Sequence, residues 1–162
     1  MKHLAISLIT LTILGCKSTE PEISQQFPRL EVIQGEMASN KWQPLARFSP
    51  RYPIVEAKAR REGCATIEYV ITPQYDILDI KVVDATSRYF GKESQNVLSK
   101  WDWSTLPKDI LVSPIKTQTR FEFCLEDGNG RCSAPKLAAR TQCSGSDVVS
   151  SVGSIIKKAK IR

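Results

Sequence analysis

Two alternating segments near the middle of the chain constrain its fold more than any other feature. In "CATIEYVI", residues 64–71, every second residue from Ala65 to Ile71 is apolar. "ILDIKVVDA", residues 77–85, follows after "TPQYD", whose proline and polar residues are typical of a turn. Apolar residues at every second position are typical of a strand that buries one of its two faces. The two segments therefore predict an antiparallel hairpin.

Helical signals lie on both sides of this hairpin. Pro53 suits the first turn of a helix through "IVEAKARRE", and Gly63 suits its stop, where a left-handed residue is favoured. After the hairpin, residues 88–101 carry one apolar helical stripe that starts near Phe90 and ends at Trp101. We interpret both aromatic residues as core residues, because this spacing predicts a helix packed on a sheet.

A third alternating segment, "IKTQTRFEFCLE" at residues 115–126, completes the order helix, strand, strand, helix, strand. That order predicts an α+β fold of two layers, with a three-stranded antiparallel sheet and the helices packed on one face. A tail follows from residue 127. Apolar residues in "DVVSSVGSIIKKAKIR", 147–162, recur at helical spacing and predict a helix on the domain. The alternative is a basic amphipathic segment at a membrane.

The first sixteen residues carry signals for export. A charged start precedes the apolar run 4–14, which is shorter than the roughly 20 residues of a membrane-spanning helix and fits a secretory signal. The end of the run, "ILGC", resembles a bacterial lipobox. We therefore predict a lipoprotein signal peptide at 1–15 and lipid attachment at Cys16, with a simple signal peptide as the alternative. By resemblance to known lipoprotein sorting, Lys17 rather than aspartate after the cysteine favours the outer membrane, with the protein facing the periplasm.

Export would place the remaining cysteines in an oxidising compartment, where disulfides form. Four cysteines allow three pairings. The single histidine, His3, lies in the predicted signal peptide, so the mature chain would lack the base of a Ser/His or Cys/His catalytic site. No CxxC spacing suggests a zinc site. We therefore predict a chain that is not an enzyme and has no cofactor or metal. Its predicted disulfide residues are Cys64, Cys124, Cys132 and Cys143.

The net charge of +6 is concentrated at the C-terminal end. Residues 127–162 carry seven lysines and arginines against two aspartates, a balance of +5, and Lys2 supplies the remaining +1. Residues 3–126 are therefore neutral overall. A nucleic-acid-binding fold needs positive charge over a domain face, so we expect no nucleic-acid partner.

The order and spacing of a set of residues between 50 and 126 match a known family. The set is Tyr52, Pro53, Ala57, Gly63, Tyr69, Val70, Ile71, Thr72, Pro73, Ile77, Ile80, Val82, Phe90, Trp101, Phe121 and Phe123. With these residues, the segment resembles the C-terminal domain of TonB, the periplasmic end of the energy transducer for outer-membrane receptors. The hairpin turn departs from the family, because Gln74-Tyr75-Asp76 stands where Asp-Gly is usual, and we expect another turn geometry.

The resemblance implies a domain at 49–126, preceded by a tether at 16–48 and followed by the tail at 127–162. It also implies that the last strand has an exposed edge, which captures an extended receptor peptide as an added strand. The alternative is that the chain's own N-terminal segment or tail caps this edge. The expected edge residues are Lys116, Thr117, Gln118, Thr119, Arg120 and Phe121.

The resemblance also suggests a disulfide pairing. If the first strand lies between the other two, Cys64 faces Cys124 across the sheet, which leaves Cys132 to pair with Cys143. The rival pairing joins Cys124 to Cys132 across "LEDGNGR". A bridge between the first and last strands would stabilise a small domain with a modest core.

These features together predict a TonB-family periplasmic interaction module on a lipoprotein. Its expected partner is a peptide of an outer-membrane receptor or another envelope protein, bound by strand addition during TonB-type transport or envelope protein interaction. The alternative is a structural lipoprotein that tethers parts of the envelope without capturing a peptide. TonB's transmembrane anchor and long proline-rich span have no counterpart in this sequence, so proton-driven transduction is not implied.

Overall fold

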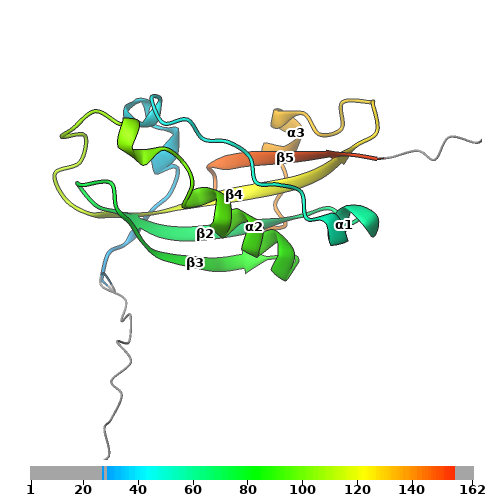
Figure 1. Cartoon of the computed structure of the whole chain (residues 1–162), viewed down its shortest axis with the longest axis horizontal. Coiled ribbons are helices and arrows are strands. Elements are labelled where there is room, and N and C mark those ends of the chain that lie inside the picture. The colour runs from blue at the N-terminus through cyan, green and yellow to red at the C-terminus, as the bar shows by residue number, and fades with distance from the viewer. Residues whose placement is uncertain (1–26, 28, 156–162) are drawn as a thin grey trace, which may run out of the picture.

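The computed structural model describes residue 27 and residues 29–155, whose core is one sheet of five strands (Figure 1). Four strands follow the order β1-β4-β2-β3, and β5 also pairs with β4. The central part of this sheet confirms the predicted arrangement, because β2 lies between β3 and β4 and is antiparallel to both. The strands are β1 (Val32–Ile33), β2 (Gly63–Ile71), β3 (Ile77–Ala85), β4 (Ile115–Glu126) and β5 (Val148–Ser154).

The described residues form three α-helices, α1 (Ile54–Lys58), α2 (Arg88–Leu98) and α3 (Ala134–Ala138). Of these, α2 packs on β2 and β3, and α3 contacts β5. Three short 3₁₀ helices, Glu36–Ala38, Asn40–Trp42 and Trp103–Thr105, lie in the connections. The Ser87 side chain caps α2 by accepting a hydrogen bond from the Tyr89 N–H.

The main core lies between α2 and one face of the sheet. Alternate residues of β2 and β4, such as Ile67 and Phe123, point to this face and are fully buried. Phe90 of α2 stacks on Phe123 with 4.4 Å between ring centroids, and Trp101 packs near Phe121. The core roles predicted for Phe90 and Trp101 are therefore confirmed, and the α+β class with them.

The tail makes the fold larger than the predicted two layers. Residues 127–147 cross the second face of the sheet, where Leu137 of α3 is buried against Cys124 and Cys132. Helices therefore lie on both faces rather than on one. The residues that β2 and β4 direct to the second face are buried under the tail rather than exposed to solvent. They are Cys64, Thr66, Arg120 and Glu122.

The prediction of a helix over the end of the tail is wrong for its described part, since residues 148–154 form β5. This strand runs parallel to β4, with Arg120 opposite Val148 and Glu126 opposite Ser154 (Figure 1). Three β-branched valines and Gly153 are poor helix formers, and the edge of β4 offers unpaired backbone groups. Residues 156–162, also predicted to be helical, lie outside the described residues.

Part of the predicted tether is also folded. Met37, Trp42 and Leu45 are buried in the main core, and β1 pairs with β4 at Lys116 and Thr117. The predicted signal peptide 1–15 and Cys16 lie outside the described residues. Among the residues that are described, no helix is both long enough and apolar enough to cross a membrane.

Candidate functional site

The β4 edge that was expected to bind a partner is covered by the chain itself. β1 pairs with Lys116 and Thr117, and β5 pairs with β4 from Arg120 to Glu126. The expectation of an exposed edge at Lys116–Phe121 is therefore wrong for this structure. The alternative, capping by the N-terminal segment or the tail, describes the structure, and both segments take part.

Side chains of β4 reinforce this cover. The Thr117 hydroxyl donates to the Ile33 carbonyl at 2.9 Å. Gln118 accepts a hydrogen bond from Gln34 and donates one to Glu68, while Phe121 is buried in the core. The side chains of Thr117 and Gln118, which sequence reasoning assigned to a partner, thus bind other parts of the same chain.

Arg120 of β4 also binds other parts of the chain. Its guanidinium donates to three carbonyls of the tail, those of Ala138 at 2.8 Å, Arg140 at 2.6 Å and Cys143 at 3.1 Å. The residue is 5% exposed, so these bonds offset the lost hydration of its guanidinium. Arg120 therefore holds the tail on the second face of the sheet.

Asp147 joins three segments at the start of β5. Its carboxylate accepts two hydrogen bonds from Arg47 Nη1, at 2.8 and 2.7 Å, and one from Thr119 Oγ1 at 2.8 Å. Its backbone carbonyl accepts the Arg120 N–H at 2.8 Å. Asp147 is 4% exposed. Sequence reasoning missed both Asp147 and Arg47, and nothing in their local sequence marks them, since they are 100 residues apart.

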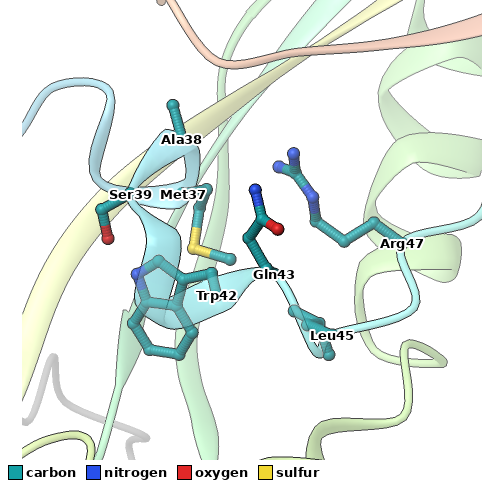
Figure 2. Close-up of a pocket in the computed structure, with 7 residues that line it drawn as sticks. All are labelled: Met37, Ala38, Ser39, Trp42, Gln43, Leu45 and Arg47. Atoms are coloured by element: carbon teal, nitrogen blue, oxygen red, sulfur yellow. The ribbon is translucent and has the colours of Figure 1, made fainter.

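Arg47 also borders a hollow of about 330 Å³ (Figure 2). The other lining residues are Met37, Ala38, Ser39, Trp42, Gln43 and Leu45. Arg47 is the one charged residue of this lining, and its guanidinium is already paired with Asp147. The hollow is therefore a packing feature of the N-terminal segment. In the described part of the chain, no three potential metal-binding residues cluster together.

Two disulfides fix the tail, but their pairing differs from the favoured prediction. The bridges are Cys64–Cys143 and Cys124–Cys132, with Cα–Cα distances of 5.9 and 5.7 Å. All four predicted cysteines are bonded, and the rival bridge Cys124–Cys132 is present. Cys64 and Cys124 do not pair, because the register of the sheet places Cys64 opposite Glu122, two residues away.

A group of charged residues surrounds the second bridge. Glu62 lies at its centre, where its carboxylate contacts Arg131 at 3.2 Å, Arg140 at 3.1 Å and the Leu125 N–H at 2.9 Å. Glu122 is 1% exposed and lies 3.3 Å from Arg120 Nε. Burial raises the pKa of Glu122, although both nearby arginines oppose this shift. These contacts again attach the tail to the sheet.

The outer edge of β5 is open in the described part of the chain. The Arg120 N–H bonds to the Asp147 carbonyl, and the Ile155 N–H bonds to the Glu126 carbonyl at 3.3 Å. In a parallel ladder these two bonds mean that the backbone N–H and C=O groups of the odd-numbered residues of β5 point towards β4. The backbone N–H and C=O groups of Val148, Ser150, Val152 and Ser154 therefore point away from the sheet.

The two outer edges of the sheet differ in character. β3 carries Asp79, Lys81 and Asp84, and its pairing with β2 is interrupted by two irregularities. Charges and bulges protect an edge against added strands. β5 has no charged residue between Val148 and Ser154. An uncharged edge of this length can accept another strand, which is how a class of protein-interaction domains binds extended peptides.

Comparisons with known proteins identify the domain. Residues 49–125 match the family described as Gram-negative bacterial TonB protein C-terminal. This part of the chain therefore belongs to the TonB C-terminal domain family, whose members are periplasmic protein-interaction modules rather than enzymes. Domains of this type interact with outer-membrane receptors or other envelope proteins.

Two solved structures are similar in sequence to part of this chain. The solution structure of the Pseudomonas aeruginosa TonB C-terminal domain is 27% identical, over 49% of this chain and 82% of that one, with a TM-score of 0.39. The TonB2 protein of Vibrio anguillarum is 23% identical, over 72% of this chain and 95% of that one, with a TM-score of 0.34. No curated protein gave a match.

The segments that cover β4 lie outside the residues matched to the family. β1 and β5 fall before residue 49 and after residue 125, and so do Cys132 and Cys143. The matched domain is thus extended at both ends by segments that close its β4 edge and present β5 as the new edge.

Proposed function

We propose that this protein is a lipoprotein of the cell envelope that captures an extended segment of another envelope protein. Lipid at Cys16 would hold it, preferably in the outer membrane, after removal of residues 1–15. Residues 17–28 would tether the domain, which faces the periplasm. The lipobox-like "ILGC" and the TonB C-terminal domain support this arrangement.

The edge that captures the peptide would be that of β5. The observation that carries this proposal is the row of outward backbone groups at Val148, Ser150, Val152 and Ser154, on a strand without charge. Each backbone hydrogen bond contributes about 0.5–1.5 kcal/mol net, which gives a short strand moderate affinity. Selection between partners then depends on side chains beside the edge.

A proline substitution tests this edge without disturbing the inner ladder. Val152 is 51% exposed and its N–H points outward, so Val152→Pro removes one outer donor and leaves the bonds to β4. We expect this variant to bind TonB-box peptides of outer-membrane receptors at least tenfold more weakly in a fluorescence anisotropy titration. Val152→Ala, the matched control, keeps the N–H and should bind like the wild type.

Two results would contradict capture at β5. One is the absence of peptide binding by the wild-type protein while its fold and both disulfides are intact. The other is equal binding by the proline and alanine variants, with matching circular dichroism. Membrane fractionation of Cys16→Ser checks the anchor separately, since this variant should leave the membrane fraction.

One observation favours a second candidate, a structural tether that binds no peptide. The edge used for partners in the expected mechanism is covered at both ends, and two disulfides fix the covering tail. A wild-type protein that stays membrane-bound but binds none of the peptides would support this function.

A further inference from the structure

A groove lies where β5 ends beside α1. It has a volume of about 640 Å³. Tyr52, Ile54, Leu125 and Ile155 line it with apolar groups. Ile54 is 73% exposed, which is unusual for a large aliphatic side chain at the start of a helix.

Packing beneath the groove makes its floor rigid. The Tyr52 ring meets Phe90 and Phe123 edge to face, with centroids 5.9 and 5.7 Å away. Its hydroxyl donates to the Arg61 carbonyl at 2.6 Å. Burial raises the pKa of Tyr52 to about 12, so the hydroxyl keeps its proton at neutral pH. The floor is therefore preorganised, which reduces the entropy lost on binding.

Gly153 allows β5 to pass closely over this floor. A Cβ at this position would lie 2.9 Å from Leu125 Cδ2 and 3.0 Å from Tyr52 Cδ2. Ser154 and Ile155 then form part of the groove wall. Because Ser154 is also the last outward residue of β5, the open edge of the strand leads directly into the groove.

Two basic residues give the groove its charge. Lys58 and Arg60 line it. Within the described residues, neither forms an ion pair. The nearby carboxylate of Glu56 is buried and already binds Arg61 and Ser87, at 2.5 Å each. The groove therefore complements an apolar group that is flanked by negative charge.

We propose that this groove binds one end of the peptide captured by β5, and that this end carries a large apolar side chain beside carboxylates. The apolar side chain would pack against Tyr52, Ile54 and Leu125, and the carboxylates would pair with Lys58 and Arg60. The inference rests on the proposed strand capture, and it defines the partner as an extended acidic and apolar segment of a protein.

Continuity between the strand edge and the groove favours a peptide over an anionic lipid surface. A lipid surface could contact Ile54 and the two basic residues, but it offers no row of donors and acceptors that matches the outward N–H and C=O groups of Val152 and Ser154. A peptide strand satisfies those groups and reaches the groove at the same time.

The test compares acidic and basic peptides of the same length. The purified protein is titrated with labelled Asp-Asp-Leu-Thr-Val-Thr-Val-Thr and with the same residues in reverse order, because the strand direction is open. Matched peptides carry Lys-Lys for Asp-Asp, or serine for leucine. We expect the acidic peptide in one direction to bind at least tenfold more tightly than its basic or serine counterpart.

Charge reversal in the protein supplies the second arm. Lys58→Glu/Arg60→Glu should remove the preference for the acidic peptide. Lys81→Glu/Lys92→Glu changes two exposed lysines elsewhere and should keep that preference. Val152→Pro should weaken binding of all the peptides, because it acts on the strand edge.

The outcomes separate the two proposals. Equal binding of acidic and basic peptides, with loss of both in Val152→Pro, would overturn the groove assignment and retain strand capture. Acidic binding that is insensitive to Val152→Pro but lost on charge reversal would retain the preference of the groove for acidic peptides and overturn strand capture at β5. No binding up to millimolar concentration would overturn both. Binding to phosphatidylglycerol vesicles through Lys58 and Arg60, without peptide preference, would identify a lipid surface and overturn the peptide assignment.

Discussion

At Gly63, the absence of a side chain allows β2 to begin beneath α2. A Cβ there would lie 2.0 Å from Thr86 Oγ1 and 2.9 Å from Phe90 Cε2. The sequence-based interpretation of Gly63 as a left-handed helix stop is wrong, since Arg60, with φ of 53°, takes that conformation after α1. Gly63 is thus required for close packing rather than for its backbone angles.

We therefore expect Gly63→Ala to lower the free energy of unfolding by about 3 kcal/mol, the upper range for overpacking. Gly128→Ala is the matched control, because its added Cβ meets nothing within 4 Å. The cost there comes from a φ of 95° and should be about 1 kcal/mol. Urea denaturation measures both. Equal losses would show that crowding at Gly63 is relieved by movement of Thr86.

At the level of elements, alternation predicted β2, β3 and β4 because each buries one face against the same core. Alternation did not predict β5, because its valines also satisfy a helical spacing. A short apolar run does not distinguish the period of a strand from that of a helix. The sheet order was predicted correctly, but the register differs by two residues from the expected one. Cys64 therefore lies opposite Glu122 rather than Cys124, and the expected bridge between these two cysteines does not form. The open edge on β5 and the Arg47–Asp147 pair depend on contacts between distant segments, which local patterns do not encode.

The loop after β4 offers a prediction at the same scale. The Glu126 carboxylate accepts backbone N–H bonds from Cys132, Gly128 and Asp127, which lower its pKa to about 2. Because the folded pKa is below the ordinary value of 4.5, the stabilisation is complete above pH 4.5 and is lost as pH falls towards 2. Glu126→Gln should flatten the dependence of stability on pH in this window, measured by thermal unfolding. An unchanged slope would assign the dependence to other carboxylates.

Over the whole molecule, the tail converts a domain of two layers into one covered on both faces. Arg120 and Asp147 bind it to the sheet, and each disulfide joins it to a different strand. The bridge Cys64–Cys143 connects β2 to the segment just before β5, across a separation of 79 residues. Cys124–Cys132 closes only 8 residues and shapes the loop before α3. The first bridge therefore constrains the unfolded chain far more than the second.

This difference predicts unequal effects of removing the two bridges. On the chain-entropy relation, Cys64→Ala/Cys143→Ala should lower the free energy of unfolding by about 4.5 kcal/mol, and Cys124→Ala/Cys132→Ala by about 2–3 kcal/mol. Urea unfolding of the two double variants measures the order, and peptide mapping without reductant checks the pairing. Since the longer bridge holds the start of β5, its loss should also weaken peptide binding more than loss of the shorter one. A greater loss of stability from the shorter bridge would mean that contacts near Cys132, rather than chain entropy, determine how the tail is held.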